Sequence, residues 1–225
     1  MSARVLVPRL AAEKALEWVP REGVVGLGTG RAAVAFVTAL ADRLRLEKYA
    51  VRGVATSQTI AELAESLGIP LVGIDEVDSI DVTVDGADEV GPDNAVIKGF
   101  GGALLREKVV ASLSRKWILI VGRDKLVDQL GARGRLPVEV VPFASQVCMR
   151  QLGKLGFNSS IRMVEGQPFL TDNANLIFDC QIQPGDDLVS LAAQIRALPG
   201  VIDTGLFTGL HPTVLVQHED QVEVR

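Results

Sequence analysis

The chain has 225 residues, of which 48% are hydrophobic, so it can bury a substantial core and is expected to fold as one large domain or a medium domain with a small one. Its 23 basic and 28 acidic residues give a net charge of −5 without a long block of either sign. This charge distribution provides no basic region of the kind that binds nucleic acid or an anionic membrane. We therefore expect a small-molecule ligand, and no nucleic-acid or membrane partner.

The two cysteines, Cys148 and Cys180, lie far apart and are expected to be reduced core residues. The two histidines, His211 and His218, have no partner at metal-ligand spacing, so no metal site is expected. Residues 1–14 lack the apolar segment of a signal peptide, and no apolar run reaches the roughly 18 residues of a membrane span. The sequence thus indicates a cytoplasmic, soluble protein.

Short apolar strands and amphipathic helices alternate through the first half of the chain. Residues 24–28 are an apolar run that ends in glycine, and the apolar positions 34, 37, 40 and 44 share one helical face. The further strands expected are residues 50–56, 70–74, 80–84, 95–99 and 116–122, and the further helices are residues 60–67 and 103–114. This order predicts a parallel or mostly parallel sheet that is covered on both faces.

The second half shows a different order of elements. We expect strands at 136–142, 160–164, 175–182 and 200–207, and helices at 143–156 and 186–198. This β-α-β-β-α-β order is typical of a ferredoxin-like α+β unit. The run 211–220 then returns to the first domain as its final strand. The predicted division is therefore one domain of residues 1–132 plus 206–225 and a smaller domain of residues 133–205.

Glycines 26, 28 and 30 follow the first strand and open the first helix. Backbone N–H groups there can approach a phosphate or carboxylate at the positive end of the helix dipole. The dinucleotide fingerprint GxGxxG would need glycine where Arg31 stands, and a Walker loop would need a GK[ST] sequence that is absent. Phosphate binding and a tight turn that merely packs both remain open.

A second loop, ATSQT, places Thr56, Ser57 and Thr59 between a strand and a helix. Hydroxyl groups at a helix start often serve only as caps, and that alternative stays open here. Both loops follow early strands, and open α/β sheets usually bind their ligands at the carboxyl ends of strands. The two loops could therefore converge on one phosphate.

Two acidic residues follow the strand predicted at 80–84. Asp85 ends the strand, Gly86 allows a turn and Asp88 comes three residues later, so both carboxylates can project from one loop. The alternative is a solvated turn.

The segment AVIKGFGGALLREK combines charged side chains with glycines, which have no side chain to cover their backbone amides. Lys98 stands at a strand end, Gly99, Gly101 and Gly102 leave amide groups uncovered, and Glu107 lies in the next helix. A lysine, two aspartates and a glutamate around bare amides can move a proton next to a carbonyl and stabilise the oxyanion that forms. That chemistry needs neither metal nor nucleotide cofactor. Purely structural loops and other chemistries remain alternatives.

Seven motifs follow one another in order: VGLGTG, DGADEV, IKGFGGALLREK, VGRDKLVDQLG, LPVEVVP, TDNANLIFD and PGVIDTGLF. In this series the chain resembles ribose-5-phosphate isomerase of type A over nearly its whole length, and DGAD followed by KGxGGAxxREK is highly specific. The resemblance implies an enzyme of the non-oxidative pentose phosphate pathway. It would interconvert D-ribose 5-phosphate and D-ribulose 5-phosphate through an enediolate, without metal or cofactor.

The resemblance also implies an α/β fold, with a Rossmann-like, mostly parallel sheet domain and a smaller ferredoxin-like α+β domain inserted before the final strand. It implies a homodimer or homotetramer, often assembled through the small domain. Glu107 would be the general base that carries a proton between C1 and C2. Asp85 and Lys98 would handle ring opening and proton exchange with the sugar oxygens, with Asp88 close by.

Lys98 would also stabilise negative charge together with the amides of residues 99–102. The residues that would bind phosphate and sugar are Gly28, Thr29, Gly30, Arg31, Ser57, Thr59, Gly99, Gly101, Gly102 and Lys125.

The chain departs from the family pattern at several positions. Arg31 and Ala32 replace two hydroxyl residues of the family's GTGST loop, although an arginine could supply a charged substitute. Pro8 or Arg9 stands where the family's first helix usually brings a lysine. Phe100 occupies a glycine position but keeps its backbone N–H. These changes bear on phosphate affinity more than on the chemical step.

Three other functions fit less well. A sugar-phosphate sensor would be expected to lose catalytic groups and to carry an attached output domain. A coenzyme A transferase could use a glutamate nucleophile but would normally need a second α/β half. A nicotinamide-dependent dehydrogenase fails at Arg31.

Overall fold

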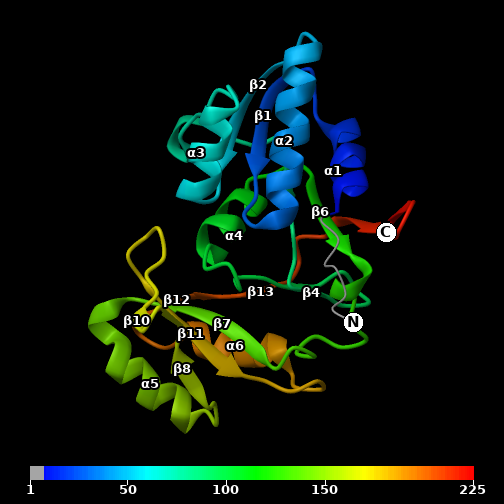
Figure 1. Ribbon diagram of the computed structural model, residues 1–225. Helices are drawn as coiled ribbons and strands as arrows, with labels where there is room; N and C mark the ends of the chain where they lie inside the picture. Colours follow the sequence, from blue (N-terminus) through cyan, green and yellow to red (C-terminus); the bar gives the residue numbers. More distant parts are fainter. Residues whose placement is uncertain (1–7) are drawn as a thin grey trace. The chain divides into compact units, whose positions relative to one another are not determined.

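The computed structural model describes residues 8–225, which divide into two compact units (Figure 1). The first unit contains residues 8–87, Arg106–Lys125 and Leu210–Arg225, and the second contains Asp88–Leu105 and Leu126–Gly209. The contacts thus group residues 88–105 with the second unit, whereas the division drawn from the sequence assigned them to the first domain. That division into 133–205 and the remainder stays a prediction. Residues 1–7 of the segment tested for a signal peptide lie outside the described part.

The elements of the first unit are α1 (Arg9–Ala15), β1 (Glu22–Leu27), α2 (Arg31–Leu46), β2 (Ala50–Ala55), α3 (Gln58–Ser66), β3 (Val82–Asp85), α4 (Leu104–Ser112, with Leu104 and Leu105 in the second unit), β6 (Trp117–Gly122), β14 (Thr213–Gln217) and β15 (Val222–Val224). Its sheet has the strand order β15-β14-β6-β3-β1-β2. All neighbours are parallel except β14 and β15. The predicted mostly parallel sheet is confirmed, and β15 is an edge strand that we did not expect.

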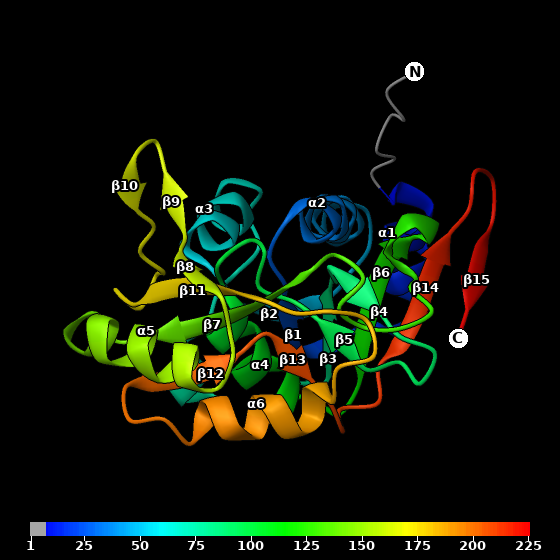
Figure 2. The ribbon, with the colours of Figure 1, turned by 90° about the horizontal axis from the view of Figure 1, so that it is seen from below.

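Layers of helices cover both faces of this sheet, because successive residues of a strand point to opposite sides. Val25 and Leu27 of β1 belong to a core that includes buried residues of α1, α2 and α3. Their neighbour Val24 packs instead with Val110 of α4. Figure 2 shows α1, α2 and α3 along one side of the sheet and α4 on the other.

The strand order creates a switch point at β1. The chain passes from β1 to β2 on one side of it, and β3 then pairs with the other side. In open α/β sheets the crevice at such a reversal, outside the carboxyl ends of the strands, is the usual ligand site. The loops after β1 and β3 are therefore the ones best placed to bind a ligand.

The strand expected at 70–74 is wrong. Only an isolated bridge joins Leu71 to Gly53, and a short 3-10 turn begins at Ile74. The Gly53 N–H donates to the Pro70 carbonyl at 2.8 Å, and the Val72 N–H donates to the Gly53 carbonyl at 3.0 Å. Because Pro70 has no N–H, the segment begins without a donor to continue the ladder.

The second unit contains β4 (Glu89–Val90), β5 (Val96–Ile97), β7 (Arg135–Val140), α5 (Ser145–Lys154), β8 (Ser159–Ile161), β9 (Met163–Val164), β10 (Gln167–Pro168), β11 (Leu176–Gln181), α6 (Leu188–Arg196), β12 (Val201–Thr204) and β13 (Leu206–Phe207). Its main sheet has the order β12-β7-β11-β8 with antiparallel neighbours. This is the ferredoxin-like arrangement predicted from the element order. Buried residues of α5 and α6 share one core with this sheet.

Both cysteines lie in this core, unpaired and buried, as predicted. Burial raises the pKa of the Cys148 thiol. It also raises the pKa of Cys180 to about 12, with a further contribution from the neighbouring charge of Asp179.

The segment 95–99 was expected to join the parallel sheet, and this is wrong. β5 pairs antiparallel with β4 and with β13 in a separate three-stranded sheet. Only residues 91–95 connect β4 to β5, with Asn94 at φ 60. So short a turn can join only antiparallel strands, since a parallel pair needs a crossover of a dozen residues or more.

Two expected strands are interrupted. The one at 200–207 divides at Gly205, where β12 ends its pairing with β7 and β13 begins its pairing with β5. The one at 160–164 divides at Arg162, and β9 then forms a hairpin with β10.

The motif TDNANLIFD forms a polar cluster around Glu139 of β7, which is fully buried. Its Oε1 accepts hydrogen bonds from the Thr171 hydroxyl at 3.0 Å and from the side-chain amide of Asn175 at 2.9 Å. The side-chain amide of Asn173 lies 3.4 Å from the same oxygen. A buried carboxylate thereby holds the segment before β11 in place.

Candidate active site

In the first unit the loops after β1, β2 and β3 meet at the carboxyl edge of the sheet. The Thr29 and Thr56 hydroxyls are 2.7 Å apart, and the Thr29 N–H donates to Asp85 Oδ1 at 3.1 Å. The Thr56 hydroxyl donates to the Leu27 carbonyl at 3.1 Å, so the Thr29 hydroxyl is the donor of the pair. Thr56 was absent from the predicted binding residues, although its position directly after β2 could have indicated it.

Asp85 is the last residue of β3 and is only 1% exposed. Its Oδ1 accepts the N–H of Gly86 at 2.7 Å besides that of Thr29. A Cβ atom at position 28 would lie 2.2 Å from the Asp85 Cγ. Gly28 is therefore required by the close approach of this carboxylate, and the three loops orient it before any ligand binds.

Two helices begin at this edge. Gly30, at φ 94, precedes α2, and the exposed Arg31 is the first residue of that helix. Ser57 caps α3, accepting the Ile60 N–H at 3.3 Å, so the cap role is real at this position. Thr59 is exposed on the first turn of α3. The amino ends of α2 and α3 thus place the positive ends of two helix dipoles next to the polar loops.

Two further predicted residues also belong to the first unit. Glu107 lies in the first turn of α4 and is 5% exposed. Lys125 is the last residue of the short 3-10 turn Arg123–Lys125 and is half-buried. This turn follows β6, the neighbour of β3, so Lys125 also stands after the carboxyl end of a parallel strand.

In the second unit Asp88 directly precedes β4 and Lys98 directly follows β5. The Asp88 N–H donates to the Ile97 carbonyl at 2.9 Å, and Asp88 Oδ2 accepts the Phe100 N–H at 2.9 Å. The N–H that Phe100 keeps in its glycine position is therefore bonded to the Asp88 carboxylate.

Lys98 is 3% exposed and is held through its backbone. Its N–H donates to the Gly205 carbonyl at 2.8 Å, and its Nζ lies 5.9 Å from the centroid of the Phe207 ring. A Cβ atom at position 205 would lie 2.1 Å from the Lys98 carbonyl oxygen. Gly205 is thus the residue that lets β13 approach β5 closely enough to fix this lysine.

Residues 99–102, called the glycine loop below, follow Lys98. Gly99 and Gly102 have φ values of 103° and 86°, which disfavour any side chain. A Cβ at Gly102 would also meet the Phe169 ring at 2.3 Å. Phe100 is not in the left-handed region, which explains why this position accepts a side chain.

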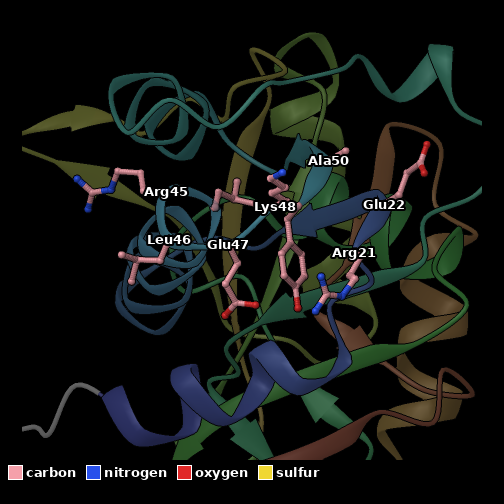
Figure 3. Close-up of a pocket in the computed structure, with 9 residues that line it drawn as sticks. Arg21, Glu22, Arg45, Leu46, Glu47, Lys48 and Ala50 are labelled. Atoms are coloured by element: carbon pink, nitrogen blue, oxygen red, sulfur yellow. The ribbon is translucent and has the colours of Figure 1, made fainter.

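A surface hollow of about 650 Å³ lies at the other end of the parallel sheet (Figure 3). It is lined by residues around the starts of β1 and β2, among them Arg21, Glu22, Glu47 and Lys48. Its lining has three basic side chains, those of Arg21, Arg45 and Lys48, against two acidic ones, and it lies at the amino ends of the strands. The hollow is therefore separate from the predicted site residues.

Within residues 8–225, no three or more histidine, cysteine or acidic side chains are grouped so that they could hold a metal ion. No helix in this part of the chain combines the length and apolar character that a membrane crossing demands.

The family described as ribose 5-phosphate isomerase A (phosphoriboisomerase A) matches residues 52–221. The chain is 46% identical over 220 residues to ribose-5-phosphate isomerase A of Gloeobacter violaceus, covering 97% of this chain and 95% of the relative. It is 44% identical over 217 residues to that of Streptococcus thermophilus, covering 96% of each.

Solved structures of the same family also match the fold of this chain. A ribose 5-phosphate isomerase A from Methanocaldococcus jannaschii superposes with a TM-score of 0.91 at 36% identity, covering 97% of both chains. A D-ribose-5-phosphate isomerase in complex with phospho-erythronic acid gives a TM-score of 0.92 at 34% identity, again over 97% of both.

Proposed function

The chain belongs to the ribose 5-phosphate isomerase A family, and we propose which of its residues carry out the isomerisation. It is an aldose-ketose isomerase that interconverts D-ribose 5-phosphate and D-ribulose 5-phosphate through an enediolate. Of all the observations, the near-complete match to isomerases in sequence and fold carries this conclusion furthest. A sensing function without catalysis is not favoured.

In our proposal Glu107 is the general base. It removes the proton from C2 of ribose 5-phosphate and returns it to C1, while a proton moves between the two sugar oxygens. The position is supported by burial, since a carboxylate that is 5% exposed is shielded from competing water. Asp85 and Lys98 open the sugar ring and exchange protons with its oxygens, and Asp88 assists in the same step.

Lys98 and the amides of the glycine loop stabilise the enediolate. Negative charge grows on the sugar oxygens as the proton leaves carbon, and fixed donors stabilise that charge at no cost in reorganisation. The burial of Lys98 and its backbone bond to Gly205 support this role, because they fix the backbone from which the side chain extends and shield the side chain from water. The phospho-erythronic acid bound by a structural relative carries a carboxylate, which is an anionic oxygen group like that of an enediolate.

The phosphate is bound at the amino ends of α2 and α3. The residues proposed for phosphate and sugar binding are Gly28, Thr29, Gly30, Arg31, Ser57, Thr59, Gly99, Gly101, Gly102 and Lys125. The positive ends of the two helix dipoles support phosphate binding there. Arg31 supplies charge in place of the hydroxyls of the family loop.

Arg31→Ala is expected to raise KM about tenfold and to leave kcat almost unchanged, because a charged hydrogen bond to phosphate serves ground state and transition state alike. Arg45→Ala, an exposed arginine in the last turn of the same helix, is the matched control and should change neither constant. Steady-state kinetics at several salt concentrations provides the measurement. An unchanged KM would make Arg31 a surface residue.

We also propose a homodimer or homotetramer that works in the cytoplasm, in the non-oxidative branch of the pentose phosphate pathway, without nucleic-acid partners. Exposed apolar side chains on the second unit support self-association: Phe143 is 100%, Met163 52% and Leu170 55% exposed. Two unpaired buried thiols fit a reducing compartment.

The decisive test is conversion of ribose 5-phosphate to ribulose 5-phosphate by purified protein, with and without EDTA. We expect turnover that EDTA leaves unchanged, because the proposed base, lysine and amides supply both proton transfer and charge stabilisation. Binding of ribose 5-phosphate without turnover would instead indicate a sensor. Turnover lost on chelation would refute the metal-independent mechanism.

A further inference from the structure

Arg162 lies between β8 and β9, and its guanidinium donates hydrogen bonds to the backbone of the glycine loop. Its Nη1 donates to the Gly99 carbonyl at 2.8 Å and to the Phe100 carbonyl at 3.0 Å. Its Nε donates to Asp179 Oδ2 at 3.0 Å, and its Nη2 donates to Asp179 Oδ1. The Arg162 side chain is 11% exposed and that of Asp179 is 15% exposed. The guanidinium of Arg162 therefore links the Asp179 carboxylate to two backbone carbonyls of the glycine loop.

The position of this arginine is itself fixed. The Arg162 N–H donates to the Ile177 carbonyl at 2.8 Å, and the Phe169 N–H donates to the Arg162 carbonyl at 2.9 Å. Asp179 lies on β11 between Phe178 and Cys180, whose side chains face the helices, so its own side chain projects from the opposite face of the sheet.

A second arginine completes the arrangement. The Arg135 guanidinium lies 3.8 Å from the centroid of the Phe100 ring, and its Nη1 is 3.6 Å from Asp179 Oδ2. Phe100 is thus held at its carbonyl by Arg162, at its ring by Arg135 and at its amide by Asp88. Both arginines share the carboxylate of Asp179.

These contacts determine where the loop amides point. The peptide between Phe100 and Gly101 is trans, so the Gly101 N–H points away from the carbonyl that Arg162 binds. The Phe100 N–H is already bonded to Asp88, and the Gly102 N–H to the Gly99 carbonyl at 3.0 Å. Among the hydrogen bonds of residues 8–225, none is donated by the N–H of Gly99, which is buried, or by that of Gly101, which is exposed. The Gly101 N–H is therefore the donor that the loop presents outward.

We propose that Arg162, anchored by Asp179, is a positioning residue for the isomerisation, and that it aims the Gly101 amide at the enediolate oxygen. The inference rests on the role proposed above for the glycine loop. The guanidinium also withdraws charge from the Phe100 carbonyl, which strengthens the N–H at the other end of the same peptide as a donor. Arg162 acts only through the loop and touches no substrate.

Arg162→Met should lower kcat about 100-fold, the cost expected of a displacement of about 1 Å in a reacting group, with KM for ribose 5-phosphate little changed. The Kd of phospho-erythronic acid should rise more than that of ribose 5-phosphate. The reason is that its carboxylate depends on the hydrogen bond from the correctly oriented Gly101 N–H. Arg162→Lys keeps the charge without the planar fork and should recover only part of kcat. If the methionine variant does not fold, the lysine variant and Asp179→Asn provide the same readouts.

Two controls separate positioning from stability. Ile195→Val trims the buried core of the second unit and should lower Tm while kcat stays at the wild-type value. Arg135→Met removes the contact with the Phe100 ring but leaves both carbonyl bonds, so its kcat should fall far less than that of Arg162→Met.

Wild-type kcat in Arg162→Met or Arg162→Lys would overturn the inference. So would equal losses of affinity for the two ligands, since a merely structural role would affect both alike. Absence of turnover in the wild-type chain would refute the proposed function instead. In that case the ratio of the two Kd values in wild type and Arg162→Met still decides whether Arg162 aims the amide.

Discussion

Replacing Glu107 by glutamine is expected to lower kcat by a factor of about 10²–10⁴, as removal of a positioned general base does. Glutamine has nearly the same size and can still accept hydrogen bonds, so the buried position in the first turn of α4 should remain filled and the fold intact. The measurement is turnover of ribose 5-phosphate together with exchange of its C2 proton with solvent. Both should fall by the same factor, while ribose 5-phosphate still binds.

The matched control is Glu65→Gln, a glutamate that is exposed on α3. It makes the same chemical change on a helix surface and should leave kcat as it is. Near-normal turnover by Glu107→Gln would show that another group moves the proton. Loss of turnover with continued exchange at C2 would place the defect in a later step.

Lys98→Met should lower kcat by about 10²–10³, the range observed when a preorganised donor to a developing oxyanion is removed. Methionine fills much of the same volume, and the backbone bond of residue 98 to Gly205 does not depend on the side chain. Near-wild-type Tm with a large loss in kcat is therefore the expected combination. Thermal unfolding and steady-state kinetics provide the two measurements.

Lys116→Met is the control for this substitution. Its Nζ also lies over an aromatic ring, 5.2 Å from the centroid of Trp18, but its side chain is exposed. Loss of that charge should leave kcat unchanged. If Lys98→Met retained wild-type kcat, charge stabilisation of the enediolate would have to come from other groups.

Local patterns predicted much of the fold. The alternation of apolar strands with amphipathic helices indicated the covered parallel sheet, because periodicities of 2 and 3.6 depend only on neighbouring residues. The β-α-β-β-α-β order likewise indicated the four-stranded antiparallel sheet of the second unit. The wrong predictions concern strands whose position depends on which other strand they pair with. Residues 95–99 read as one more parallel strand, yet the short turn at Asn94 makes β5 antiparallel to β4.

For the candidate site, too, some residues could be predicted from the sequence and others are evident only in the structure. Asp85, Asp88, Lys98 and Glu107 could be selected from sequence because their residue types suit proton transfer and their motifs are continuous in the chain. Thr56 was passed over in favour of Ser57 and Thr59. Only the structure shows the Thr56 hydroxyl against Thr29, while Ser57 serves as a helix cap.

By itself the sequence determined the family, most of the helices and strands, and the proposed catalytic groups, since each of these rests on residues that lie close together in the chain. The tertiary structure alone decided which distant residues hold those groups. Gly205 fixes the backbone of Lys98 from 107 positions away, and Arg162 binds the Gly99 carbonyl from 63 positions away. No local pattern specifies such partners, because strand pairing and close packing bring them together only when the chain has folded.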